Sequence, residues 1–393
     1  MHQIHRLIDK YHEITASPRN MAAKNMWSQH RSIVLDKWRG CPKPYRELGT
    51  PPVVVWLGTD IMQEMTGMDV GRYYSEPAYF LECWLKSKIF HFETFNDDGY
   101  YDTQIPIWLG EGFEATLFGM PMCYSKTRDP WVDRSQPPIL EDQPVNDLPY
   151  PTFASGGLMP LAIQFYEELK TMLNGTGLEP VFQNWGNGPM MTCNYLFGFE
   201  NTAMSFYTNP DFIAALLMYI AQARIAWTKE RANYLVEPIS KGEILDDDVC
   251  VPNVSPDIYN QFIFPAEKRL SDFHNGISYW HCCGPAEPYM SKVIDLKNVD
   301  LVSSGPFSDH KQIAKSIGNQ AAIEHHVKPQ DEGVAATDKS LYQLFSDIKQ
   351  MYNDSEVTAY TLRLTAYRNP SQSFKDDIER VKRWVEIAKE TRA

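Results

Sequence analysis

Apolar and polar positions follow two alternating periods along the second half of the chain. Short apolar runs of strand length are each followed by a stretch with apolar residues three or four positions apart, which is the helical spacing. The pattern predicts strands at 277–283, 300–303, 320–326 and 356–364, and helices at 286–296, 308–317, 338–352 and 374–389. Such alternation indicates parallel strands joined by right-handed crossovers, as in a doubly wound sheet or a (β/α)₈ barrel.

The first half of the chain is less regular. A helix is predicted at 158–173, with strands at 180–183 and 242–245. Before residue 80 the pattern predicts a helix at 22–38, a proline-rich bend and an apolar strand at 53–56. We therefore expect an N-terminal helical extension, residues 1–80, that packs on a barrel catalytic domain formed by residues 81–393.

Composition and charge narrow the class of protein. The chain has 393 residues, 43% of them hydrophobic, and a formal net charge of −13, which argues against nucleic-acid binding because phosphates need a basic surface. Its 7 cysteines are an odd, scattered set and predict no disulfide framework. The polar start of the chain is unlike a signal peptide, and Gln222 and Arg224 interrupt its longest apolar stretch. We expect a cytoplasmic protein that does not enter membranes.

The segment from Gly276 to Pro285 is the strongest candidate site. Its sequence, GISYWHCCGP, is a β-rich run that ends in His281, Cys282 and Cys283 before Gly-Pro stops the strand. Residues two apart on a strand point the same way, so His281 and Cys283 share a face. Imidazole and thiolate on one face suit Zn²⁺. The alternative is a buried cysteine pair beside a core histidine.

Polar groups also follow the other predicted strands. These are Asp246 to Asp248, Ser303 to Gly305, Glu324 to His326, and Arg363. The carboxyl ends of barrel strands form the face on which active sites are built, which favours a site there. No glycine-rich nucleotide motif and no Walker lysine loop is present, which counts against a nucleotide-dependent enzyme.

Four segments together resemble the uroporphyrinogen decarboxylase superfamily. They are Glu114-Ala115 with Phe118-Gly119; Asn187-Gly188-Pro189 with Leu196-Phe197-Gly198 and Asn209-Pro210-Asp211; Asp247-Asp248 with Val254-Ser255-Pro256 and 262–265; and His281-Cys282-Cys283-Gly284. The resemblance covers about residues 60–390 and implies a (β/α)₈ TIM barrel.

Within this superfamily the chain is most similar to the corrinoid-dependent methyltransferases. It lacks the arginine-rich motif and the Gly-Asn-x-Asp-Pro turn of the decarboxylases, whereas His281 and Cys283 match the zinc-binding His-x-Cys-Gly signature of the methyltransferases. The coenzyme M enzymes of that branch take a third ligand from a cysteine on the last strand, which is absent here. Asp247, Asp248, Glu324 and His326 are possible replacements, and we expect His326 as a metal ligand and the three carboxylates as catalytic groups.

The resemblance implies a zinc-dependent O-demethylase of anaerobic metabolism. A methyl donor, with a methoxylated aromatic compound favoured, would pass its methyl group to the Co(I) of cobalamin. The chain lacks the Asp-x-His-x-x-Gly corrinoid motif, so the cobalamin would belong to a separate corrinoid protein. A homodimer is possible. Two alternatives are a decarboxylase-like lyase that holds a small carboxylated substrate through Arg363, and a non-catalytic partner of the corrinoid protein.

Overall fold

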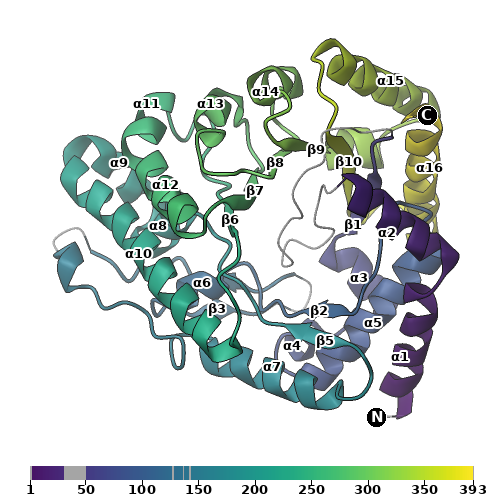
Figure 1. Cartoon of the computed structure of the whole chain (residues 1–393), viewed down its shortest axis with the longest axis horizontal. Coiled ribbons are helices and arrows are strands. Elements are labelled where there is room, and N and C mark those ends of the chain that lie inside the picture. The colour runs from purple at the N-terminus through teal and green to yellow at the C-terminus, as the bar shows by residue number, and fades with distance from the viewer. Residues whose placement is uncertain (1, 31–49, 126–127, 136, 141–142, 393) are drawn as a thin grey trace.

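The strands lie at the centre of the molecule and the helices surround them (Figure 1). The computed structural model describes residues 2–30, 50–125, 128–135, 137–140 and 143–392. The strands are β1 Val53–Leu57, β2 Gln104–Pro106, β3 Met122–Cys123, β4 Trp131–Val132, β5 Glu179–Val181, β6 Gly242–Leu245, β7 Ile277–Cys282, β8 Leu301–Ser304, β9 Ala322–His326 and β10 Tyr360–Ala366.

Eight parallel strands form the wall of the barrel. Six of them make one sheet in the order β1-β10-β9-β8-β7-β6, and β2 pairs with β5 in a second sheet. The two sheets meet where Asn187 forms a parallel bridge with Leu245, and the Gly188 N–H donates to the Leu245 carbonyl at 2.7 Å. The wall follows chain order from β5 through β6 to β10, β10 returns to β1, and β2 lies beside β5. The predicted α/β barrel is therefore confirmed.

The helices fill the connections between the strands and build the N-terminal extension. They are α1 His2–Thr15, α2 Pro18–His30, α3 Thr59–Thr66, α4 Val70–Tyr73, α5 Pro77–Thr94, α6 Phe113–Thr116, α7 Met159–Met172, α8 Pro189–Phe197, α9 Phe199–Thr208, α10 Pro210–Leu235, α11 Pro256–Ile258, α12 Phe264–Phe273, α13 Met290–Val293, α14 His310–Ile317, α15 Asp338–Asp354 and α16 Phe374–Arg392. Short turns of 3₁₀ helix occupy Val145–Asp147 and Glu287–Tyr289, and π-helical turns occupy Tyr259–Ile263 and Pro329–Val334.

The N-terminal extension and the barrel share one strand. α1 packs against α5. β1, however, belongs to the sheet, where Val54 lies beside Arg363 of β10. Residues 53–57 of the expected extension are thus part of the barrel wall. The end of the helix expected at 22–38, and most of the proline-rich bend, lie outside the described residues.

One predicted helix is shorter in the structure. The helix expected at 286–296 is a 3₁₀ turn followed by the four-residue α13. β3 pairs antiparallel with β4 outside the barrel wall.

Two apolar layers hold the barrel together. Inside it, one layer consists of Val54, Leu245, Tyr279, Leu301, Ala322 and Ala359. Outside it, the alternate residues of the same strands pack against the helices; Ile244, Trp280 and Val302 belong to this larger cluster. Because successive strand side chains point to opposite faces, residues of β7 alternate between the two layers. His281 therefore follows Tyr279 into the barrel interior.

No helix in the described part of the chain is both long enough and apolar enough to span a membrane. The longest, α10, carries the buried Arg224. Its guanidinium donates to the carbonyls of Asn187 at 3.3 Å and Glu243 at 2.6 Å. This helix therefore packs on the barrel wall, as its interrupted apolar pattern predicts.

Glu267 gives the fold a titrating group between α12 and β7. It is fully buried and accepts hydrogen bonds from the Tyr259 hydroxyl at 2.6 Å and the Trp280 indole at 3.4 Å. Burial raises the pKa of Glu267 to about 7. A carboxyl group whose pKa is higher in the folded state stabilises the protein at low pH, and this contribution is lost as the pH rises through 7.

We expect Glu267→Gln to change the pH dependence of stability. The neutral amide keeps an oxygen acceptor and cannot ionise, so the variant should gain up to about 3 kcal/mol relative to the wild type between pH 4.5 and pH 8. Urea unfolding of both proteins across this range measures the difference. A difference that is constant with pH would contradict the assigned titration.

Candidate metal centre

Two neighbouring strands bring the candidate ligands together. Leu245 of β6 pairs with His281 of β7, and the two strands are parallel. The chain leaves both strands on the same side of the barrel, so Asp247 and Cys283 follow their strand ends at one rim. The backbone N–H of Cys283 donates to Oδ1 of Asp247 at 2.9 Å, which links the two loops directly.

Three potential ligand atoms from these residues face one another. Nε2 of His281 lies 3.1 Å from Sγ of Cys283 and 3.4 Å from Oδ1 of Asp247. The three donor atoms all lie within 4.8 Å of one another, and they form the one such group of His, Cys, Asp or Glu residues among those described. We call Asp247, His281 and Cys283 the ligand cluster.

The donor set of the ligand cluster fits a divalent metal ion. One imidazole nitrogen, one sulfur and one carboxylate oxygen are all ligand types that Zn²⁺ accepts, and three protein ligands leave a fourth position for substrate. Burial, followed by the negative charge of Asp247, raises the pKa of the Cys283 thiol. A cation would counter both effects, because it favours the thiolate and neutralises the carboxylate.

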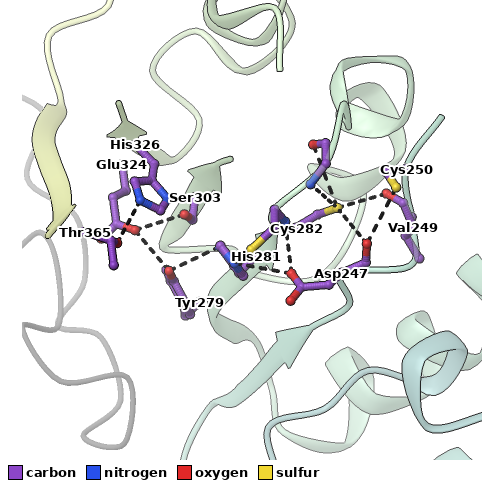
Figure 2. Close-up of polar contacts among 12 residues, drawn as sticks. Asp247, Val249, Cys250, Tyr279, His281, Cys282, Ser303, Glu324, His326 and Thr365 are labelled. Atoms are coloured by element: carbon purple, nitrogen blue, oxygen red, sulfur yellow. Dashed lines mark hydrogen bonds and ion pairs between the residues drawn. The ribbon is translucent and has the colours of Figure 1, made fainter. Parts of the chain in front are cut away.

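The imidazole of His281 has a partner on its other side. Nδ1 faces the hydroxyl of Tyr279 at 3.5 Å, and the two rings lie nearly parallel, with an interplanar angle of 9°. The Tyr279 hydroxyl donates in turn to Oε1 of Glu324 at 3.0 Å. Figure 2 shows His281 between Asp247 on one side and Tyr279 on the other. A proton on Nδ1 would leave Nε2 as the lone-pair atom that faces the cluster.

Glu324 is the centre of a buried hydrogen-bond network below the ligand cluster. Its Oε1 also accepts from Ser303 at 2.9 Å and from Arg363 at 2.8 Å. The Arg363 guanidinium lies 3.4 Å from the centre of the Trp56 ring. Burial alone would lower the pKa of Arg363, but the charge of Glu324, its hydrogen bond and the nearby Tyr279 and Cys283 together raise that pKa. Arg363 is therefore a buried cation that lies 2.8 Å from the Glu324 side chain.

The structure separates the remaining predicted site residues from the ligand cluster. His326 lines the same cavity, but its Nε2 pairs with the Thr365 hydroxyl at 2.8 Å, and burial lowers its pKa. Asp248 accepts from the Asn194 amide at 2.8 Å and does not line the cavity. Neither His326, predicted as a ligand, nor Asp248, predicted as a catalytic group, belongs to the ligand cluster.

The other two residues of the predicted runs are structural. Asp246 is fully buried, and its carboxylate accepts the N–H groups of Met190 and Met191 at the start of α8. Cys282 is also fully buried and donates to the Val249 carbonyl at 3.3 Å. Cys282 therefore belongs to the core, on the face of β7 away from the ligand cluster.

The ligand cluster opens into a cavity of about 430 Å³. The cavity is lined by the three cluster residues, by Tyr279, His326 and Arg363 from the barrel interior, and by many aromatic rings, among them Trp56, Trp108 and Tyr367. A volume of this size is typical of small-molecule sites.

Sequence reasoning missed two residues of this site. Tyr279 stands two positions before His281 on one strand, so the alternation that pairs His281 with Cys283 also includes Tyr279. The sequence therefore contained a signal for Tyr279. It contained no signal for Trp56, because the contact of Trp56 with Arg363 depends on the pairing of the first and last strands.

The family comparison agrees with this architecture. The uroporphyrinogen decarboxylase (URO-D) family matches residues 113–331, more than half of the chain, and the chain belongs to this family. Among solved structures, a methyltransferase from Methanosarcina mazei is similar over 89% of this chain and 96% of its own, with a TM-score of 0.63 and 15% sequence identity. That similarity shows the shared fold. No curated protein matches the sequence.

Proposed function

We propose that the protein is a zinc-dependent methyltransferase that demethylates a methyl donor and passes the methyl group to a separate corrinoid protein. The observation that supports it most is the ligand cluster, which places nitrogen, sulfur and oxygen donors within 4.8 Å of one another. Because it also lines a small-molecule cavity, a metal held there would face the substrate. Asp247 would supply the third ligand, in place of the last-strand cysteine that the coenzyme M enzymes have and this chain lacks.

The ligand set favours an oxygen-containing donor. With one thiolate, one imidazole and one carboxylate, a bound Zn²⁺ would act as a Lewis acid on the ether oxygen. The residues around it hold that geometry: Tyr279 orients the imidazole of His281, and the Cys283 N–H fixes the Asp247 carboxylate. The aromatic walls of the cavity favour a methoxylated aromatic compound as the methyl donor.

The transfer balances without a further redox partner. The bond between the methyl carbon and the ether oxygen breaks, and its electron pair stays on the oxygen. The methyl group bonds to Co(I) of the cobalamin, which supplies the electron pair of the new bond. The oxygen leaves as a phenolate and takes a proton from water. A phenol has an ordinary pKa near 10, so its conjugate base is a moderate leaving group that metal coordination improves further.

Two measurements on the wild-type protein test the proposal. Metal analysis of the purified chain should find one zinc per chain. Incubation with reduced cobalamin and a panel of methoxyarenes, quaternary amines and methanol should convert Co(I) to methylcobalamin, followed by absorbance, with a methoxyarene the best donor. A chain that carries no zinc and forms no methylcobalamin with any donor would refute the proposed function.

The lyase alternative is less well supported by the site. It would need Arg363 to hold a substrate carboxylate, whereas this guanidinium is buried between Glu324 and Trp56. A location in the cytoplasm stays a prediction. The transfer assay tests the non-catalytic alternative, and a measurement of molecular mass tests the possible homodimer.

Tyr279→Phe tests the assigned orientation of His281. Loss of the hydroxyl removes the partner of Nδ1, and such outer contacts typically change metal affinity about 10-fold to 100-fold. We expect weaker zinc binding in competition with a chromophoric chelator. Ser303→Ala serves as the control, because Ser303 contacts Glu324 but not the imidazole. Equal affinities for Tyr279→Phe and the wild type would show that Tyr279 does not position the ligand.

A further inference from the structure

The cavity continues beyond the barrel interior to the inner face of α5. Phe80, Trp84, Ser87 and His91 of this helix line the same cavity as the ligand cluster. Their spacing of three and four residues puts them on one side of the helix. α5 itself packs outside the sheet, against α1 and α7. The cavity therefore connects two layers that the wall of a closed barrel would separate.

A break in the barrel wall explains this connection. Within the described ranges, no strand pairing joins β1 to β2. The N–H groups of Val53 and Val55 instead donate to the side chains of Asp98 and Asp97, at 2.8 and 3.0 Å. Paired strands lie about 4.8 Å apart and leave no passage between them, whereas here the segment after Asp97 stands beside β1 and lines the cavity. We call the part of the cavity next to α5 the α5 arm.

Aromatic rings form most of the α5 arm. Tyr73 and Phe80 lie 5.0 Å apart between ring centres, and Tyr101 lies 6.3 Å from the imidazole of His91. Two polar groups of the arm are paired, because His91 Nε2 contacts the buried Asp97 at 3.0 Å. Lys88 of α5 also lines the cavity, and its ammonium lies 5.4 Å from the centre of the Trp84 ring. Such a wall offers mainly flat apolar contacts, which suit a second aromatic ring.

We propose that the α5 arm binds the distal ring of a two-ring aromatic methyl donor whose methoxy end reaches the ligand cluster. The inference rests on the proposed function for the role of the methoxy group, and on the cavity itself for the second ring. A cavity of about 150 Å³ holds one benzene molecule. The 430 Å³ found here has room for two linked rings. A single-ring donor would leave the arm without an apolar occupant.

Ser87→Leu tests the arm by filling it. Ser87 is buried, and its hydroxyl bonds the carbonyl of Trp84 in the same helix at 3.0 Å, so a leucine loses one local contact and adds apolar volume to the arm. The probes are a methoxyphenol and a methoxy-hydroxy-biphenyl, each with its two oxygens at opposite ends. Binding to the zinc-loaded protein is measured by calorimetry without corrinoid. Ser346→Leu, an exposed position on α15, is the matched control.

The expected pattern is specific to the two-ring ligand. The wild type and Ser346→Leu should bind the biphenyl about tenfold more tightly than the single ring. Ser87→Leu should lose that advantage, because the leucine side chain would occupy the space of the distal ring. If Ser87→Leu weakened the binding of both ligands equally, or weakened the binding of neither, the proposal would be overturned. Ser87→Val adds less volume and repeats the test if the leucine variant fails to fold.

Failure of the arm and failure of the proposed function can be told apart. If the biphenyl binds through the arm but no methylcobalamin forms, the arm stands as a binding site and the methyl transfer is wrong. If single-ring donors transfer methyl groups while Ser87→Leu leaves biphenyl binding unchanged, the function stands and the arm is wrong.

Discussion

Cys283→Ser should leave the protein folded but without zinc. The substitution replaces the one sulfur of the ligand cluster by a hydroxyl that does not ionise near neutral pH. Changes outside the ligand shell already cost about 10-fold to 100-fold in metal affinity, so loss of a ligand should cost more than about 100-fold. We expect less than one zinc per ten chains after dialysis, and methylcobalamin formation lowered by at least the same factor.

Cys282→Ser is the matched control for this experiment. Cys282 is the adjacent residue, it points to the opposite face of β7, and it contacts the Val249 carbonyl instead of the ligand cluster. A serine hydroxyl can donate to the same carbonyl. This variant should keep one zinc per chain. If Cys283→Ser retained its zinc, or if Cys282→Ser lost it, the ligand cluster would be wrongly assigned.

Arg363→Met should destabilise the fold by about 3–5 kcal/mol, because it leaves the carboxylate of Glu324 buried without its cation. The two side chains are 2.8 Å apart and both almost fully buried. Methionine has a similar length and keeps an apolar contact with Trp56. Urea unfolding of the variant and the wild type measures the loss. The slope of the free energy of unfolding against urea concentration should be the same for both proteins.

A double variant separates the charge effect from the loss of packing. Glu324→Gln together with Arg363→Met removes both charges, and it should recover a large part of the stability that Arg363→Met loses. A cost below about 1 kcal/mol for Arg363→Met would show that the pair is not structural. Arg363 would then be available to hold a substrate carboxylate, and the lyase alternative would regain support.

The barrel could be predicted from the sequence because the hydrophobic period that marks each of its strands and helices is a local property. Each strand and helix after residue 277 shows its own period, and parallel strands joined by helices have few possible arrangements. The helix at the C-terminus illustrates this: the Ser373 hydroxyl accepts the Asp376 N–H at 3.2 Å, and Ile378, Val381 and Val385 are buried, as the pattern predicts. The break between β1 and β2 has no local signal, because it depends on Asp97 and Asp98 replacing a neighbouring strand.

The sequence alone also determined that His281 and Cys283 lie together, because a strand turns alternate side chains to one face whatever surrounds it. The tertiary structure decided the rest of the cluster. Three consecutive aspartates end β6, and only the pairing of β6 with β7 selects Asp247 among them. His326 stands on β9, and β8 separates that strand from β7. Two strand spacings amount to about 10 Å between backbones. His326 therefore does not reach the cluster, although it is a histidine like His281 and lies at the same rim.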